Sequence, residues 1–285
     1  MKAKIDCIPC IFNQAFRAGN AATNDEKLIR EILDRAGERV KDINLELTPP
    51  EAALPVYELV EKITGNSDPY KKIKKEHIKL ALEIYPLMKE KVCSSDDRLK
   101  EAIKIAIAGN AIDLGSTLET IDVKEEFLNI EKGEFFLDSL EEFADLLVKS
   151  DNILYLSDNA GETVFDRPLV EEIKRLGKKI TYAVKERPII NDAVYEDAVL
   201  SGIDADIIST GSSVAGTVLS TCSKSFLRYF KNSDLIIAKG QGNYETLSDV
   251  SAPIFFLFKV KCNPIAQDSG FPKNSMILLK SRNFS

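Results

Sequence analysis

Four segments rich in polar and charged side chains each follow a short apolar run in the second half of the sequence. The segments are Asp158-Asn159-Ala160-Gly161-Glu162, Lys185-Glu186-Arg187 with Asn191-Asp192 beyond it, Thr210-Gly211-Ser212-Ser213, and Lys239-Gly240-Gln241-Gly242-Asn243. The apolar runs before them, 153–157, 179–184, 206–209 and 234–238, are expected to be strands. Because ligands of open parallel sheets bind outside the carboxyl ends of the strands, the four segments are candidates for one shared site.

An aspartate and an asparagine after the first strand, with an aspartate beyond the second, offer oxygen ligands to a cation. These residues are Asp158, Asn159 and Asp192. Oxygen ligands without histidine or thiolate favour Mg²⁺ or Mn²⁺ over Zn²⁺. We therefore predict a divalent cation at this edge of the sheet.

Positive charge beside the cation would suit an anionic substrate. Lys185 and Lys239 stand at two of the strand ends, and Ser212 and Ser213 are expected to open a helix whose backbone N–H groups can bind an anion. Phosphoryl transfer depends chiefly on positioning and on neutralisation of charge, and it does not require histidine. The pattern therefore predicts a phosphate site.

Each segment taken alone is also typical of an ordinary turn, because Asp, Asn and Gly favour turns. The partial GxGxxG match that begins at Gly240 ends in Glu245 and lacks the following crossover that a dinucleotide site requires. The hypothesis of a shared site therefore depends on the coincidence of four polar segments at one sheet edge.

The single histidine, His77, restricts the chemistry that the chain can perform. A Ser-His-Asp triad or an HExxH zinc site cannot be assembled unless His77 takes part in it. Because charged residues flank His77 on a helical pattern, we expect it at the surface.

Composition and an N-terminal sequence without the apolar core of a signal peptide favour a cytoplasmic protein. The net charge of −7 and the pI near 5.1 disfavour nucleic acid as a partner, and the lysines at 71–72 and 74–75 are expected on a solvated helix face. No apolar run reaches membrane-spanning length, so no membrane partner is expected. Five cysteines, an odd number, are expected to be reduced thiols.

The hydrophobic period changes near residue 150. Residues 1–150 carry helical patterns, with Asn24, Asp25, Ser67 and Asp68 as candidate N-terminal caps. They are expected to form an all-helical domain. Residues 151–285 alternate apolar runs with amphipathic helices, and the runs 254–260 and 276–280 would extend the same sheet. The predicted fold is therefore α/β, with an open, mostly parallel, Rossmann-like sheet and an N-terminal helical domain.

Several motifs resemble those of the DUF89 family, whose members are also called damage-control phosphatases. The motifs are DNAGE at 158–162, PIINDA at 188–193, AKGQGNYETL at 238–247 and VKCNPIA at 260–266. Cys7-Ile8-Pro9-Cys10 is similar to the CxxC of the prokaryotic subfamily I of that family. The resemblance spans nearly the whole chain.

The resemblance implies metal-dependent hydrolysis of phosphate monoesters, with the metal on Asp158, Asn159 and Asp192. The cation would be Mn²⁺, Ni²⁺, Mg²⁺ or Co²⁺, and the substrate a small phosphorylated metabolite such as a damaged sugar phosphate or a nucleotide. Neither the substrate nor the oligomeric state follows from the sequence.

Further site residues follow from the same resemblance. Glu162, Lys185 and Asn243 match positions that face substrate or water, and Lys239 matches a phosphate contact. In the helical half, Asn110 and Asp113 of AGNAIDLG match a Gly-Asn-x-x-Asp motif and are expected to reach over the crevice.

We expect the cation to lower the pKa of a bound water for in-line attack, with Asp158 or Glu162 orienting that water. Lys239 and Lys185 would offset charge on the phosphate oxygens, and Ser212 with Ser213 would hold the rest of the group.

Three alternatives compete with this mechanism. A covalent aspartyl-phosphate route needs a second aspartate two residues after Asp158, where the chain has Ala160. A methyltransferase that uses S-adenosylmethionine needs a glycine-rich turn after the first strand and an acidic residue after the second, which Gly161 and Lys185 fit poorly. A non-catalytic protein that binds phosphometabolites shares every feature except turnover.

The role of Cys7 and Cys10 does not follow from the cation hypothesis. A structural zinc site needs a second pair of ligands, but Cys93, Cys222 and Cys262 are isolated in the sequence. A thioredoxin-type motif belongs at a strand-to-helix turn, whereas these cysteines begin a probable helix. We therefore expect buried thiols that pack the first helix onto the sheet.

Overall fold

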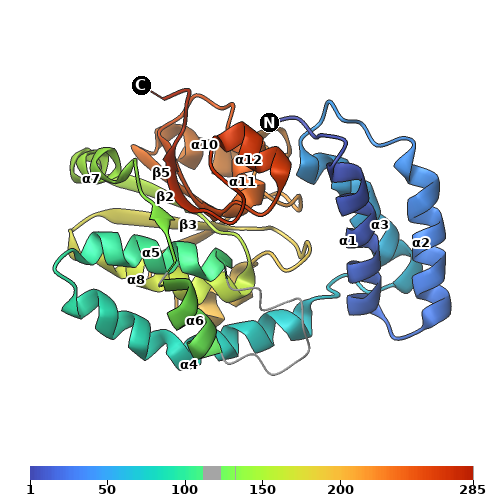
Figure 1. Cartoon of the computed structure of the whole chain (residues 1–285), viewed down its shortest axis with the longest axis horizontal. Helices are drawn as coiled ribbons and strands as arrows, with labels where there is room; N and C mark the ends of the chain where they lie inside the picture. Colours follow the sequence, from blue (N-terminus) through green and yellow to red (C-terminus); the bar gives the residue numbers. More distant parts are fainter. Residues whose placement is uncertain (112–122, 132, 285) are drawn as a thin grey trace.

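The computed structural model describes residues 1–111, 123–131 and 133–284. A central sheet carries helices on both faces, and a group of three helices lies to one side of it (Figure 1). Within the described ranges, no helix combines the length and the apolar character that crossing a membrane requires.

The sheet contains seven strands among the described residues, in the order β1-β7-β6-β5-β2-β3-β4. Their bounds are β1 Phe135–Phe136, β2 Asn152–Leu156, β3 Lys179–Val184, β4 Asp206–Ser209, β5 Leu235–Lys239, β6 Ile254–Lys259 and β7 Met276–Lys280. All neighbouring strands are parallel except β6 and β7. The predicted α/β fold is confirmed, and the short strand β1 is an addition to it.

The helices between the strands of the second half cover both faces of the sheet. They are α8 Thr163–Arg175, α9 Tyr195–Leu200, α10 Lys224–Asn232, α11 Gly240–Leu247 and α12 Asn263–Ser269, with the short 3₁₀ helices η1 Ala160–Glu162 and η2 Leu219–Thr221. Alternate residues of each strand face opposite layers, because side chains alternate along a strand. In β2, Ile153 and Tyr155 pack in the layer that contains α8, and Leu154 and Leu156 pack with α10 to α12.

Helices from the first half also belong to the layer that contains α8. They are α4 Lys71–Ser94, α5 Arg98–Ala111, α6 Val123–Glu131 and α7 Leu140–Lys149. Their buried residues, such as Ile105, Phe127 and Phe143, share one hydrophobic core with α8 and with the strands. Figure 1 shows α4, α5 and α8 side by side below the sheet.

A second core holds the first three helices together: α1 Cys7–Ala22, α2 Glu26–Val40 and α3 Pro49–Thr64. The side chain of Asp25 caps α2, as predicted, by accepting a hydrogen bond from the backbone N–H of Lys27 at 2.9 Å. The other predicted caps, Asn24, Ser67 and Asp68, are wrong, because α2 begins at Glu26 and α4 begins at Lys71 after Tyr70. The division of the chain at residue 150 stays a prediction, and the separately packed helical unit consists of α1 to α3.

Two residues of α4 that were expected at the surface are buried. His77 is 7% exposed and Lys74 is 1% exposed, whereas Lys71, Lys72 and Lys75 are exposed as predicted. The expectations for His77 and Lys74 are wrong because the helix turns this side toward α8, α9 and η1. Lys74 is accommodated there by ion pairs with two carboxylates, Asp68 at 3.1 Å and Asp197 at 3.2 Å.

The expectation for the CxxC motif is also wrong. Cys7 is half-buried and Cys10 is exposed, and α1 packs on α2 and α3 and not on the sheet. Among the described residues, no three His, Cys, Asp or Glu side chains are grouped so that they could hold a metal ion, so the structure gives no support to zinc at this motif.

The order of the strands changes direction at β2. The chain continues from β2 to β3 and β4 on one side and then crosses back to β5 on the other. A crevice forms at such a switch point because the loops after the two central strands leave in opposite directions. The loops after β2 and β5 are those that carry Asp158 and Gly240.

Candidate functional site

The loop after β5 touches the loop after β2 at this switch point. Gly240 adopts φ +79°, and a Cβ atom added to it would lie 1.8 Å from Oδ2 of Asp158. Only glycine fits this position, because the backbone conformation is left-handed and the carboxylate occupies the space of a side chain. The backbone of α11 therefore lies directly against Asp158.

The segment after β3 folds back onto the segment after β2. Asn159 and Asp192 form an antiparallel bridge, and the backbone N–H of Ala193 donates to the Asp158 carbonyl at 2.8 Å. Ile190, in the turn before Asp192, has φ +47°, a strained conformation for a β-branched residue. The fold thus brings Asp158, Asn159 and Asp192 together, as the cation hypothesis requires, while their role as ligands stays a prediction.

Asn110 reaches this group from α5. Its Nδ2 donates to Oδ2 of Asp158 at 3.1 Å and to Oε1 of Glu162 at 2.8 Å, and its Oδ1 accepts the backbone N–H of Lys259 at 3.0 Å. The neighbouring Gly109 makes this approach possible, because a Cβ there would lie 2.6 Å from the Cβ of Phe165 on α8. Asp113, the second residue predicted from this helix, lies outside the described residues.

Lys239, the last residue of β5, is fully buried between two carboxylates. Its Nζ lies 2.6 Å from Oδ1 of Asp166 and 3.3 Å from Oε2 of Glu162. Burial alone would lower the pKa of Lys239, but the charges of Asp166 and Glu162 outweigh it and raise that pKa. Lys239 is therefore a charged group within the site, and its predicted contact with phosphate stays a prediction.

Lys185 follows β3 and is also buried. Its Nζ lies 3.6 Å from Oδ2 of Asp192 and donates to the carbonyl oxygen of Gly216. This contact places the loop 211–218 beside the candidate cation ligands.

No helix begins at Gly211, so the predicted helix N-terminus at Ser212 and Ser213 is wrong. Residues 211–218 form a loop, because Gly211 and Gly216 adopt φ values of +72° and +68° that a right-handed helix does not contain. The Ser212 hydroxyl is buried against that of Thr221 at 2.6 Å. The Ser213 hydroxyl accepts from Nε of Arg187 at 3.4 Å.

Asn243 lies on the first turns of α11 and is fully buried. Its Nδ2 donates to the carbonyl oxygens of Ser157 and Lys239 at 3.0 and 2.8 Å, and its Oδ1 accepts from the Thr217 hydroxyl at 2.7 Å. These bonds join the ends of β2 and β5 to the loop 211–218. A role of Asn243 in substrate binding stays a prediction.

The site carries more negative than positive charge when its groups are ionised. The carboxylates of Asp158, Glu162, Asp166 and Asp192 face the two ammonium groups of Lys185 and Lys239. Burial, and then the charges of Glu162 and Asp192, raises the pKa of Asp158 well above its usual value. Burial likewise raises the pKa of Asp192 to about 6, although Lys185 opposes the shift.

These carboxylates and the adjoining amide suit a divalent cation. Four carboxylates against two ammonium groups leave two negative charges in this cluster, the charge that one divalent ion offsets. Oδ2 of Asp192 is buried without a hydrogen-bond partner. The Asn159 amide nitrogen donates to Glu162 at 2.6 Å, which leaves its oxygen to bind a cation. Two carboxylates and one amide do not form a closed protein cage, but Mg²⁺ usually keeps several waters.

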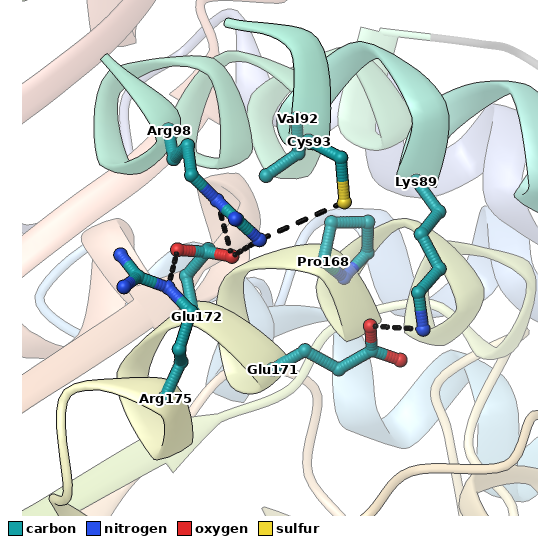
Figure 2. A pocket seen from close by; sticks show the side chains of 8 residues that line it. All are labelled: Lys89, Val92, Cys93, Arg98, Pro168, Glu171, Glu172 and Arg175. Atoms are coloured by element: carbon teal, nitrogen blue, oxygen red, sulfur yellow. Dashed lines mark hydrogen bonds and ion pairs between the residues drawn. The ribbon is translucent and has the colours of Figure 1, made fainter. Parts of the chain in front are cut away.

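A hollow of about 210 Å³ lies elsewhere, between α4, α5 and the end of α8 (Figure 2). Its polar lining consists of Lys89, Cys93, Arg98, Glu171, Glu172 and Arg175. Glu172 accepts from Arg98 at 2.6 Å on one oxygen and from Arg175 at 2.7 Å on the other. Glu171 pairs with Lys89 at 3.2 Å and accepts from the Tyr85 hydroxyl. Because every carboxylate oxygen here has a partner, we interpret this cluster as structural.

Three residues of the site were missed by sequence reasoning. Asp166 and Tyr182 are buried partners of the charged network, and Gly240 supplies the space for Asp158. The spacing of Asp166, four residues after Glu162 at the start of a helix, places both carboxylates on one helix face and could have identified it. Tyr182, inside an apolar strand, carries no comparable signal.

Comparison with known proteins gives consistent matches over the whole chain. Residues 3–277 match the family described as "Damage-control phosphatase ARMT1-like domain". An uncharacterised protein of Methanocaldococcus jannaschii is 38% identical over 293 residues, which cover 98% of this chain and 96% of that protein. A damage-control phosphatase of Pyrococcus horikoshii is 34% identical over 287 residues and 99% of both chains.

Two further matches agree with these. A damage-control phosphatase of Archaeoglobus fulgidus is 34% identical over 287 residues, which cover 97% of this chain and 98% of that protein. The crystal structure of a DUF89 family protein from Pyrococcus horikoshii superposes with a TM-score of 0.90 at 33% identity, covering 99% of this chain and 100% of that chain.

Proposed function

Because this chain belongs to the family of damage-control phosphatase ARMT1-like domains, also named DUF89, we propose that it is a phosphatase of small phosphorylated metabolites that depends on a divalent cation. One observation carries the metal dependence. A buried cluster with two more carboxylates than ammonium groups lies at the switch point of the sheet, and one of its carboxylate oxygens has no hydrogen-bond partner.

Asp158, Asn159 and Asp192 are the residues that would hold the cation, which would be Mn²⁺, Ni²⁺, Mg²⁺ or Co²⁺. When bound, such an ion supplies positive charge for the phosphate oxygens and lowers the pKa of a bound water. The backbone bridge between Asn159 and Asp192 keeps two of these side chains at a fixed separation before any ligand arrives. Preorganised ligands of this kind need little rearrangement on binding.

Glu162 is the residue best placed to orient a water. Its Oε1 accepts hydrogen bonds from Asn110 at 2.8 Å and Asn159 at 2.6 Å, so this oxygen is occupied and the carboxylate is fixed. Its Oε2 faces Lys239 at 3.3 Å, a long contact that leaves acceptor capacity. Glu162 thus combines a fixed orientation with an oxygen that can accept a proton from water.

The ammonium groups of Lys185 and Lys239 would offset charge that develops on the phosphate oxygens. Both are buried, and burial strengthens their interaction with an anion. The loop 211–218 is held to Lys185 through Gly216. Ser212 and Ser213 of this loop would hold the rest of the phosphate group by exchanging their present bonds with Thr221 and Arg187.

The proposal places this reaction in the cytoplasm, without nucleic acid or membrane as a partner. The net charge of −7 supports the absence of nucleic acid. Among the described residues all five cysteines are free thiols, as in a reducing compartment.

The test is an assay with a generic phosphate ester on protein stripped of metal, with Mg²⁺, Mn²⁺, Ni²⁺ and Co²⁺ added in turn. We expect at least one ion to restore hydrolysis, and chelator to remove it. Asp158→Ala should lower the rate on the order of a hundredfold or more, because the charge of the cation is lost with its ligand. Asp145→Ala, an exposed carboxylate on α7, serves as the matched control.

Hydrolysis that resists the chelator and survives Asp158→Ala would contradict the metal-dependent mechanism. Calorimetry with phosphorylated metabolites separates the remaining possibilities, because tight binding without release of inorganic phosphate would indicate a binding protein.

A further inference from the structure

Asp166 lies behind the candidate cation ligands and is fully buried on the first turn of α8. Both of its oxygens have partners. Oδ1 accepts from Nζ of Lys239 at 2.6 Å, and Oδ2 accepts from the Tyr182 hydroxyl at 2.6 Å. The two contacts fix the carboxylate in one orientation.

The ammonium group of Lys239 contacts two carboxylates, and it lies closer to one than to the other. The distance from its Nζ is 2.6 Å to Asp166 and 3.3 Å to Glu162. A charge-assisted N–H···O bond is normally about 2.7–2.9 Å long, so the bond to Asp166 is fully formed and the contact with Glu162 is not. Asp166 therefore forms the stronger ion pair with Lys239.

Oε2 of Glu162 keeps acceptor capacity because Lys239 bonds more strongly to Asp166. Its other oxygen already accepts two amide N–H groups, and Oε2 itself pairs with Lys239 at 3.3 Å. If Asp166 carried no charge, its hold on the ammonium would weaken, and the Coulomb attraction between Lys239 and Glu162 would shorten that contact. Oε2 would then be occupied by a salt bridge.

We propose that Asp166 is a positioning residue that holds the Lys239 ammonium away from Glu162, so that Oε2 of Glu162 stays available to the attacking water. The inference rests on the proposed phosphatase function for its catalytic meaning. The part of the proposal that concerns the two distances from Lys239 to Asp166 and Glu162 can be tested without measuring turnover.

A purely structural role makes a different prediction. If Asp166 only neutralised Lys239, its loss would lower the stability of the fold and leave turnover by the folded protein unchanged. Glu172 provides the comparison, because it is a buried carboxylate on the same helix that pairs with two arginines far from the strand ends.

The first test is the crystal structure of Asp166→Asn beside that of the wild type. Asparagine preserves the shape and can still meet both Lys239 and Tyr182, while the charge is removed. We expect the distance from Lys239 Nζ to Glu162 Oε2 to shorten to about 2.8 Å. A distance unchanged from 3.3 Å would overturn the proposal whether or not the protein is a phosphatase.

The second test is kinetic. In Asp166→Asn, kcat should fall on the order of tenfold or more while KM changes less than about twofold, because the loss concerns the attacking water and not substrate binding. Combined with Glu162→Gln, the substitution should add almost nothing, since the oxygen that it protects is already lost. Glu172→Gln should leave kcat unchanged.

Additive losses in the double variant, or a normal kcat in Asp166→Asn, would contradict the proposal. Tyr182→Phe gives a second route if Asp166→Asn does not fold. It removes the bond that fixes Oδ2 of Asp166, and we expect a smaller fall in kcat, again with little change in KM; an unchanged kcat would count against the proposal. Absence of hydrolysis in the wild type would refute the phosphatase function alone, and the crystallographic distance would still decide the role of Asp166.

Discussion

The segment from Glu162 to Arg175 carries buried carboxylates at both of its ends, and the two ends are organised differently. At the far end, Glu171 and Glu172 meet Lys89, Arg98 and Arg175, and each carboxylate oxygen has a partner (Figure 2). At the near end, Glu162 and Asp166 share Lys239 beneath two further aspartates.

The difference lies in the balance of charge. The far cluster is satisfied from within the protein, as a structural network must be if it is not to destabilise the fold. The near cluster holds an excess of carboxylates, a buried Asp192 oxygen that has an ion pair with Lys185 at 3.6 Å but no hydrogen bond, and raised pKa values at Asp158 and Asp192. Unsatisfied buried charge is unfavourable unless a ligand completes it, and we therefore propose the near cluster as the functional end of the segment.

The largest effect on activity is expected from a substitution of Gly240, because its backbone lies against Asp158 of the near cluster. Gly240→Ala places a Cβ 1.8 Å from Oδ2 of Asp158, so the carboxylate must move. We expect phosphatase activity to fall on the order of a hundredfold or more, in line with the loss of a preorganised charge contact. Steady-state kinetics and metal titration measure it, and Gly177→Ala, a left-handed glycine with open space around it, controls for backbone strain.

The far cluster should respond in stability and not in activity. Glu172→Gln leaves Arg98 and Arg175 without their shared carboxylate, and the free energy of unfolding should fall by about 1 kcal/mol, because both arginines are partly exposed to solvent. Chemical denaturation measures this change, while kcat should equal that of the wild type. A loss of activity in folded Glu172→Gln would show that the two ends of α8 are not independent.

In the metal-free protein, the free energy of unfolding should depend on pH through Asp192 of the near cluster. The pKa of Asp192 is raised to about 6, so the native state binds a proton more tightly than the unfolded chain. Its contribution to stability is therefore present below pH about 4 and is lost as the pH rises through about 6, a change of roughly 3 kcal/mol.

Denaturation from pH 4 to 7 of the wild type and of Asp192→Asn isolates this contribution as the difference between the two curves. Saturating Mg²⁺ should reduce the difference, because the cation stabilises the ionised carboxylate. Parallel curves for the two proteins would contradict the raised pKa.

The smallest effect is expected inside the hollow of the far cluster. Cys93 is exposed and makes only a weak contact, at 3.6 Å, with Arg98. Cys93→Ser should change the free energy of unfolding by less than about 0.5 kcal/mol and leave kcat unchanged. A marked change in kcat would mean that this hollow communicates with the strand ends.

The fold could be predicted from the sequence because its signals are local. Short apolar runs separated by amphipathic segments identify a parallel sheet, and the residues after each run identify its functional edge. Asp158 and Asn159 come directly after β2, so their place at that edge needed no knowledge of distant contacts. The two-residue strand β1 carries too little pattern to be recognised.

The features that could not be predicted from the sequence depend on contacts between segments that are distant in the chain. His77 and Lys74 lie among charged residues in the sequence, but α4 turns them toward other helices, and Asp68 and Asp197 make the buried lysine acceptable. The helix expected at Ser212 is absent because glycines at 211 and 216 take left-handed conformations. The link from Lys239 to Asp166 spans 73 residues, a separation that no local pattern encodes.

The separate core of α1 to α3 has a consequence for the dynamics of the protein. These helices bury their apolar residues against one another and meet the rest of the chain chiefly where α3 packs on α11 (Figure 1). A unit with its own core can unfold locally at a lower free-energy cost than global unfolding. We therefore expect its amide hydrogens to exchange with solvent faster than those of β2 and β5, which hydrogen-exchange measurements would show.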